Sequence, residues 1–331
     1  MDENSPFEDD DNLINYDTKT QTFSSLNIGK DSKLSSSLSN ENTENIQSSI
    51  KPLNTEYKQK TGKKKNKKKK KKPTFGWRIV YWFSIIIMVG ALVALGVIVA
   101  GYAEGCMMYK EISEDVLTVD NDSSDLANMK VDWDKLLSIN PETVGWVYIP
   151  GTQVNYPVVH TTDNEKYLKT TFRNYRSNVS FGTIFVDSED SHDLSNANIV
   201  TYGHHMNDGS MYAKIATLKD SAEFNKNRNI YFLTPAGNYR LKSFSVVMTN
   251  GQDKIVQTSF SNKASMNNYI QDKINRSCVT PDSPIPDVNS IDKIFTFSTC
   301  DYFENDGRTI LFAYVAESTV AGVNGLDVGR Y

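Results

Sequence analysis

An uninterrupted apolar stretch constrains this chain more than any other feature. Residues 79–103, IVYWFSIIIMVGALVALGVIVAGYA, contain no charged side chain. A helix rises 1.5 Å per residue, so about twenty apolar residues cross the hydrocarbon core of a bilayer. The apolar region of a cleavable signal peptide is normally about 7 to 15 residues long, although GYA before Glu104 resembles a cleavage site. The length therefore predicts one uncleaved transmembrane helix.

A dense lysine run precedes that stretch. The sequence KKKNKKKKKK occupies residues 63–72. Lysines flanking a membrane span favour the cytoplasmic side, so we expect the N-terminus inside and everything after Ala103 outside. The run also attracts anionic lipid headgroups. It has no folded basic groove or interleaved aromatic residues, so nucleic-acid binding is not expected. These features predict a single-pass protein of the cell membrane.

Composition and charge change along the chain. The net charge is +5 over residues 1–103 and −9 over residues 104–331. An acidic exterior fits an amine-bearing partner better than a polyanion. The patterns predict six segments: a disordered cytoplasmic tail (1–62), a polybasic juxtamembrane segment (63–78), the transmembrane helix (79–103), a polar extracellular stalk (104–130), a folded domain (131–320) and a C-terminal tail (321–331).

The folded domain reads as mostly β. A short amphipathic helix should lead into a strand at 144–150. Further segments rich in β-branched and aromatic residues are bounded by turn residues and begin near 155, 181, 198, 229, 239, 293 and 308. Seven or eight such strands indicate a barrel or a sandwich. Helices are expected at 163–172 and 261–276, and the second carries an apolar stripe that should pack on the sheet (Met266, Ile270 and Ile274).

Histidine is scarce, which narrows the search for a proton carrier. The chain has four: His160, His192, His204 and His205. The last two follow a predicted strand in NIVTYGHH, where a rigid sheet edge suits a site residue. Taken without the rest of the chain, however, this stretch favours an ordinary surface or hydrogen-bonded histidine over a site residue. A zinc ion bound by His204, His205 and Cys300 is a further alternative. Adjacent strand residues point to opposite faces, however, so one ion rarely binds both histidines. For the same reason, only one of the two should face Cys300.

Three cysteines are few for a disulfide scaffold, and the odd number means that at least one is free or pairs with another chain. Cys106 and Cys278 fit inert small residues. A disulfide between Cys278 and Cys300 remains an alternative at this point, and it would remove any reactive thiol.

Cys300 ends an apolar run in TFSTCDYFENDGR, with Arg308 eight residues later. A cysteine in this position is usually part of a core. A hairpin, however, would bring the guanidinium back beside the thiol, where it favours the thiolate and offers donors to a developing oxyanion. The alternative is that acidic residues of the connection pair with the arginine: Asp301, Glu304 or Asp306.

Taken together, these motifs resemble the sortases, the Gram-positive cysteine transpeptidases that attach proteins to the cell wall. The resemblance rests on TFSTC, on GR opening the next strand and on YGHHM about a hundred residues earlier. Residues 132–168 and 202–212 are more similar to class B than to class A members, and the likeness covers roughly residues 130–319.

The resemblance implies a fold and a site. The fold would be a closed eight-stranded β-barrel with N-terminal helices and an extra helix before the cysteine strand. Cys300 matches the nucleophile, His204 the catalytic histidine and Arg308 the catalytic arginine. His205 stands where many class B sequences have Asn, and Phe297 where Leu is usual. Thr296 and Ser298 would line the substrate groove, or alternatively face the core. No cofactor and no resident metal are implied.

The resemblance also implies a reaction. Cys300 would attack the Thr carbonyl of an Asn-Pro-x-Thr sorting signal on a surface protein, and His204 would protonate the leaving amine. A cell-wall peptide amine would then resolve the thioester. Asp301 is expected to be a solvated turn acid rather than a partner that orients His204. Two alternatives remain: an exported cysteine hydrolase with water as acceptor, and a non-catalytic surface-binding domain.

Overall fold

The computed structural model describes residues 74–118, 126–177, 179–251, 253, 256–301 and 306–326. The tail at 1–62 and the lysine run lie outside the described residues. The chain divides into two compact units, and of the unit that ends at Trp82 only the start of one helix is described. The account below concerns the second unit unless stated.

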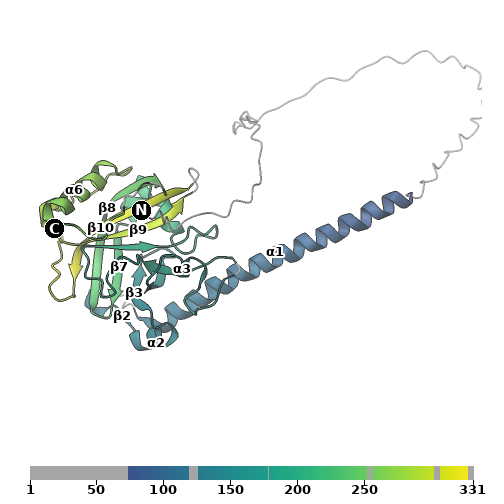
Figure 1. Ribbon diagram of the computed structural model, residues 1–331, viewed down its shortest axis with the longest axis horizontal. Helices are drawn as coiled ribbons and strands as arrows, with labels where there is room; N and C mark the ends of the chain where they lie inside the picture. Colours follow the sequence, from purple (N-terminus) through teal and green to yellow (C-terminus); the bar gives the residue numbers. More distant parts are fainter. Residues whose placement is uncertain are drawn as a thin grey trace, which may run out of the picture. The chain divides into compact units, whose positions relative to one another are not determined.

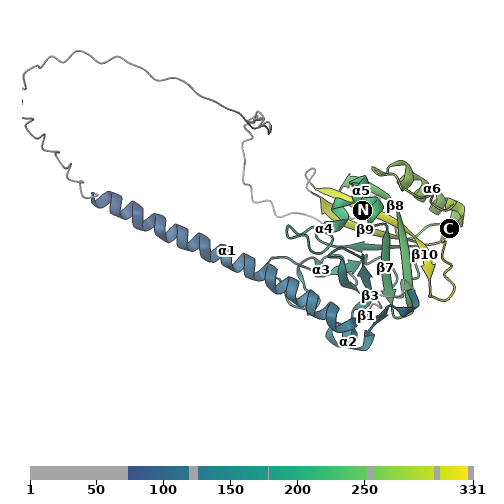
Figure 2. The same cartoon turned by 180° about the vertical axis from the view of Figure 1, so that it is seen from behind.

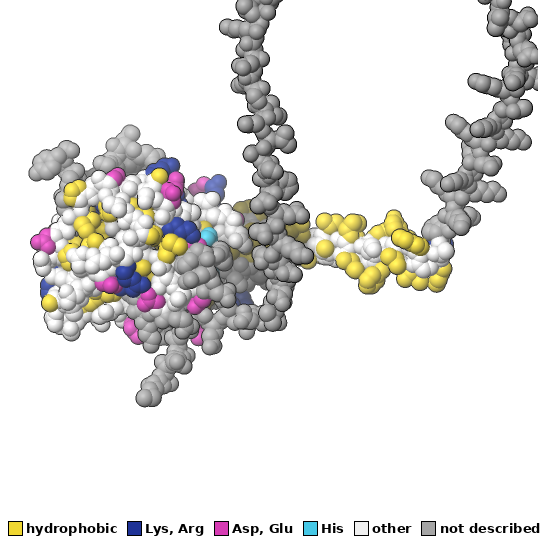
Figure 3. Space-filling view, turned by 90° about the horizontal axis from the view of Figure 1, so that it is seen from above, with side chains coloured by type: hydrophobic (Ala, Val, Ile, Leu, Met, Phe, Trp, Pro, Cys, Tyr) yellow, Lys and Arg dark blue, Asp and Glu magenta, His cyan; other side chains and the backbone are white. Residues whose placement is uncertain are grey.

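Helix α1 (Phe75–Val116) contains the apolar stretch and is long and apolar enough to cross a membrane. Most of its large apolar side chains from Phe75 to Val99 are exposed, and Figure 3 shows an apolar surface along the helix. The structure differs from the polar stalk expected at 104–130. Residues 104–116 continue α1 and bury a stripe on the domain: Gly105, Met108, Tyr109, Ile112 and Val116. Polar residues between these positions hid the stripe from a composition-based reading.

Eight strands close into a barrel, which confirms the expected fold. Figures 1 and 2 show the sheet from two sides, with β7, β8, β9 and β10 labelled. The order around the barrel is β10-β8-β7-β3-β4-β5-β6-β9. The strands are β3 (Thr143–Tyr148), β4 (Asn155–His160), β5 (Ile184–Val186), β6 (Asn198–Tyr202), β7 (Asn229–Thr234), β8 (Gly237–Asn250), β9 (Ile294–Asp301) and β10 (Gly307–Ser318). The β4–β5 and β6–β9 pairs are parallel, and the other pairs are antiparallel.

The two faces of β9 bury different clusters. Phe295 and Phe297 lie in the main core inside the barrel, where Phe295 packs against Phe232 with ring centroids 5.0 Å apart. Ile294 belongs to a second cluster on the outer face. Since strand residues alternate between faces, Thr296, Ser298 and Cys300 project outward with Ile294. Phe297 is fully buried in the core, so the Phe-for-Leu difference is an apolar core exchange.

Helices and short elements fill the connections. They are β1 (Leu117–Thr118), η1 (Leu126–Asn128), β2 (Lys130–Val131), α2 (Trp133–Ile139), α3 (Lys166–Lys169), α4 (Ala213–Thr217), α5 (Ser221–Lys226), α6 (Lys263–Asn275) and η2 (Val288–Ser290). Helix α3 is shorter than the predicted 163–172. The Asp163 carboxylate accepts hydrogen bonds from the backbone N–H groups of Glu165 and Lys166, and the chain is extended again at Thr170. Helices α4 and α5 are too short to show a periodic pattern.

Helix α6 covers the outer face of β8 and β10 (Figures 1 and 2). A capping box between Asn262 and Ser265 fixes its start. Met266 and Ile270 are buried against the outer side chains of the sheet, while Ile274 is partly buried. The predicted apolar stripe therefore packs on the barrel, as expected.

We predict that Ile270→Ala lowers the free energy of unfolding by about 2 to 5 kcal/mol, because it leaves a cavity under α6. Asn268→Ala, at an exposed position of the same helix, should change it by no more than about 0.5 kcal/mol. Urea unfolding of the full chain in detergent micelles, followed by tryptophan fluorescence, measures both. Equal midpoints for the two variants would show that α6 is not held by this contact.

Candidate active site

The register between β9 and β10 brings a thiol and a guanidinium together. Cys300 on β9 pairs directly with Arg308 on β10, and Asp301 pairs with Gly307. Residues directly opposite in an antiparallel pair project from the same face, with Cβ atoms roughly 4.5 to 5.5 Å apart. The hairpin predicted from STC and GR is therefore formed, and both side chains stand at one end of the outer face that α6 covers further along.

Arg308 is held in place by its own turn. Its side chain is almost completely buried, and Nη2 lies 2.6 Å from a carboxylate oxygen of Asp306. Its Nη1 donates to the carbonyl oxygen of Gly307 at 3.1 Å. The pairing with Asp306 that the sequence offered as an alternative is thus present. Arg308 nevertheless keeps its position opposite Cys300 in the strand register, and the two contacts fix the plane of its guanidinium.

Asp301 differs from its expected role as a solvated turn acid. It is 5% exposed, and one carboxylate oxygen accepts hydrogen bonds from Lys219 and from the hydroxyl of Thr309, each at 2.6 Å. Because β9 continues through Asp301, its side chain points to the face opposite Cys300. The carboxylate ties the end of the β9–β10 hairpin to the α4–α5 connection. If the predicted strand had been extended from Cys300 to Asp301, the alternation of side chains would have predicted this inward position.

The parallel pairing of β6 with β9 brings the histidine pair to Cys300. Tyr202, the last residue of β6, lies opposite Ser298, and the next N–H, that of Gly203, donates to the Ser298 carbonyl at 3.2 Å. The two histidines therefore follow alongside the end of β9. A Cβ atom at Gly203 would lie 2.5 Å from Ile184 and 2.7 Å from the Tyr212 ring, so this position requires glycine.

The ring of His204 is oriented by a backbone carbonyl. Its Nε2 lies 2.6 Å from the carbonyl oxygen of Leu168. A carbonyl only accepts, so Nε2 carries the hydrogen and Nδ1 is the nitrogen that can exchange a proton. Burial lowers the pKa of His204, the bond to Leu168 opposes this, and the charge of Lys169 adds to the lowering. The neutral form of the imidazole is therefore favoured, with Nδ1 as the nitrogen without a hydrogen.

The ring of His205 makes a different contact. Its Nδ1 lies 3.1 Å from the backbone carbonyl of Cys300, so Nδ1 is the donor. The expectation that only one of the two histidines lies on the side of Cys300 rested on strand alternation. It does not apply, because β6 ends at Tyr202 and both histidines lie beyond it. The His205 ring bonds to the backbone of the cysteine strand, and the His204 ring bonds to the backbone of α3.

Cys300 differs in solvent exposure from Thr296 and Ser298, the two candidate groove residues on the same strand. Cys300 is partly exposed, whereas Ser298 and Thr296 are buried. The hydroxyl of Thr296 donates to the side chain of Asn198 at 2.8 Å. This contact favours the alternative left open for Thr296, that it is structural rather than part of a groove.

The remaining cysteines and histidines form neither a disulfide with Cys300 nor a metal site among the described residues. All three cysteines fall within the described residues, and no disulfide joins Cys278 to Cys300. The thiol of Cys106 on α1 donates to Asp208 at 3.3 Å. His160 and His192 contact each other, with ring centroids 5.7 Å apart. Within the described part of the chain, no cluster of three His, Cys, Asp or Glu side chains has the geometry of a metal site.

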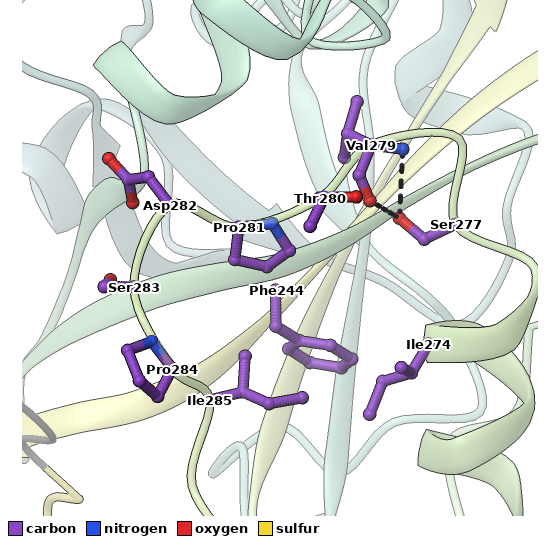
Figure 4. Close-up of a pocket in the computed structure, with 10 residues that line it drawn as sticks. All are labelled: Phe244, Ile274, Ser277, Val279, Thr280, Pro281, Asp282, Ser283, Pro284 and Ile285. Carbon is purple, nitrogen blue, oxygen red and sulfur yellow. Dashed lines mark hydrogen bonds between the residues drawn. The ribbon is translucent and has the colours of Figure 1, made fainter.

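A cavity of about 450 Å³ opens near the end of α6 (Figure 4). Its lining comes from β8, α6 and the following connection: Phe244, Ile274, Ser277, Val279, Thr280, Pro281, Asp282, Ser283, Pro284 and Ile285. The hydroxyl of Ser277 bonds to the backbone of Val279 at its rim. None of the candidate catalytic residues lines this cavity, so it is separate from the Cys300 site.

Comparisons with known proteins identify the family. A family model described as a sortase domain matches residues 147–316. Sortase B of Staphylococcus aureus is 29% identical over 190 residues, covering 57% of this chain and 76% of that protein. Sortase B of Listeria monocytogenes is 29% identical over 166 residues, covering 50% of this chain and 65% of that protein.

Solved structures agree. The X-ray structure of Clostridium perfringens sortase B matches with a TM-score of 0.51 and 32% identity, covering 55% of this chain and 97% of that one. Bacillus anthracis sortase B matches with a TM-score of 0.55 and 27% identity, covering 65% and 98%. With a family model spanning about half of the chain and relatives of one class, this chain belongs to the sortases, class B, the cysteine transpeptidases of cell-wall protein sorting.

Proposed function

We propose that this chain is a membrane-anchored transpeptidase that cleaves an Asn-Pro-x-Thr sorting signal and transfers the Thr carbonyl to a cell-wall peptide amine. The observation that supports it most is the position of Cys300 directly opposite Arg308. His205 contacts the Cys300 carbonyl, and His204 follows Gly203, whose N–H bonds to β9. The roles of the three residues follow from that arrangement and from the class B motifs.

The reaction has two acyl-transfer steps. In the first, the Cys300 thiolate forms a C–S bond to the Thr carbonyl carbon, while the C–N bond to the next residue breaks. Arg308 donates to the oxyanion, and Nδ1 of His204 gives its proton to the leaving amine. In the second, the acceptor amine loses a proton to Nδ1 and forms a new C–N bond as the C–S bond breaks. Thiolate and imidazolium are regenerated.

The direct test is to trap the thioester. The purified full chain is mixed with an Asn-Pro-x-Thr peptide, quenched in acid and examined by intact-mass spectrometry. We expect the N-terminal peptide fragment attached at Cys300, and its faster release as an amide when a peptide amine is added. Cys278→Ala should keep the adduct and Cys300→Ala should lose it. Release as the free acid alone, whatever the amine, would favour the hydrolase; an inert Cys300 would favour a binding domain.

The anchoring follows from α1. We propose that residues 79–103 span the membrane once, with the polybasic segment at 63–78 in the cytoplasm and residues 104–331 outside, 131–320 being the catalytic domain.

Protease added to intact cells should therefore digest residues after 103 and leave an N-terminal fragment that an antibody to the tail detects. Permeabilised cells provide the control, because there the tail should also be lost. A mature protein beginning near Glu104 would contradict the uncleaved anchor.

The two histidines should respond differently to substitution. His204→Ala removes the proton carrier, so peptide cleavage and amine transfer should fall by at least about 10²-fold. His205→Asn keeps a side-chain donor for the Cys300 carbonyl, and it should retain most activity. Cleavage rates of the two variants, with thermal melts as the folding control, decide between them. The reverse order of activities would assign the proton carrier to His205.

Arg308 provides the third test. If it stabilises the oxyanion, Arg308→Ala should lose about 10²- to 10³-fold in rate with the fold intact. Arg308→Lys keeps the charge but lacks the planar pair of donors, so it should also be strongly impaired. Arg240→Ala is the matched control, because it removes an ion pair with Glu317 at the other end of the β8–β10 pair, and it should retain most activity. Near-normal turnover of both Arg308 variants would reduce Arg308 to a structural ion pair.

A further inference from the structure

The described C-terminal turns of α1 reach the neighbourhood of His204 through one buried hydroxyl. Tyr109 is 2% exposed. Its hydroxyl donates to the carbonyl oxygen of Gly182 at 2.5 Å and accepts from the backbone N–H of Phe172 at 3.3 Å. The hydroxyl therefore connects α1 to two segments, the connection after α3 and the one leading into β5.

Gly182 lies directly against the carbonyl that orients His204. Its φ is +61°, and a Cβ atom there would lie 2.6 Å from the Tyr167 carbonyl oxygen, 2.9 Å from that of Leu168 and 3.0 Å from Cδ2 of His204. The backbone of Gly182 thus fixes the space available to the Leu168 carbonyl and to the imidazole. A shift of Gly182 would move both partners of the 2.6 Å hydrogen bond between Leu168 and His204.

The ring of Tyr109 has little freedom to move. It packs edge-on against Tyr156, with centroids 5.3 Å apart, and stacks on Phe181 at 5.8 Å. One turn earlier, a Cβ atom at Gly105 would lie 2.5 Å from the Phe181 ring, so α1 approaches this segment as closely as glycine permits. The hydroxyl is therefore held at a defined position from which it can locate Gly182.

We propose that Tyr109 is a positioning residue for His204: its hydroxyl holds Gly182, and Gly182 holds the Leu168 carbonyl against Nε2 of the imidazole. The helix that anchors the enzyme thereby also sets the orientation of its proton carrier. The catalytic part of this inference rests on the proposed function, in which His204 moves the proton. The positioning part rests only on the contacts above.

Tyr109→Phe is the sharpest variant, because it removes the hydroxyl and keeps the packed ring. The buried Gly182 carbonyl would lose its donor and the segment would shift. We expect kcat to fall roughly tenfold with the KM for the peptide little changed, since misplacement of a catalytic group affects the chemical step. The bond to Leu168 raises the pKa of His204, so weakening it should move the pH-rate limb belonging to His204 to lower pH. Lys169, the charged neighbour, is unchanged.

Ser245→Ala is the matched control. Ser245 is fully buried on β8 and its hydroxyl donates to the carbonyl of Lys273 on α6 at 2.6 Å. This variant also removes one buried hydroxyl-to-carbonyl bond, but on the face covered by α6. It should lower stability by a comparable amount and leave kcat and the pH profile as in the unsubstituted chain.

A second readout does not depend on turnover. The chain contains four histidines, so ¹⁵N-histidine labelling of the full chain in detergent micelles gives few ring signals, and His204→Ala assigns the one required. We expect the Nε2–H tautomer in the unsubstituted chain and a loss of that preference in Tyr109→Phe, but not in Ser245→Ala. If Tyr109→Phe matches Ser245→Ala in both kcat and ring signals, the proposal is overturned. If the unsubstituted chain shows no transfer, the proposed function fails, and the ring signals alone decide the positioning.

Discussion

The antiparallel register of β9 on β10 is the constraint on which the site depends. It places Cys300 opposite Arg308 on the outer face and turns Asp301 to the other face, where Lys219 and Thr309 bind its carboxylate. A slip of one residue would exchange the two faces, burying the thiol and exposing a carboxylate in its place. The core position of Phe297 and the buried bonds of Asp301 oppose such a slip. The interactions that stabilise this hairpin are therefore also those that assemble the Cys–Arg pair.

The histidines are supplied by a second pairing, far apart in sequence. Parallel β6 runs beside β9 and ends at Tyr202, so the two residues after Gly203 emerge next to Cys300. Each ring then has its own carbonyl partner, that of Leu168 for His204 and that of Cys300 for His205. Because a carbonyl only accepts, both tautomers are set by backbone position. The site is thus built where strand ends meet, and its side chains are oriented largely by main-chain atoms.

Much of this could be predicted from local patterns. The limits of β7 agree with the apolar run at 229–234, and the STC and GR motifs gave the hairpin that joins Cys300 to Arg308. Other features depend on contacts that no local pattern carries. The polar stretch after Ala103 contains a buried stripe whose partners lie in the barrel. Asp301 resembled a turn acid because Lys219 is 82 residues away. The face of each histidine could not follow from alternation once β6 had ended.

The central proposal is that Arg308, opposite Cys300 in this register, favours the thiolate as well as the oxyanion, and the first effect can be measured without a peptide substrate. In a Cys106→Ala, Cys278→Ala background only Cys300 reacts with iodoacetamide. Its alkylation rate at neutral pH is compared between chains carrying Arg308 and Arg308→Gln. The account predicts a rate roughly tenfold lower in Arg308→Gln, because less thiolate forms without the guanidinium. Equal rates over the whole pH range would contradict it.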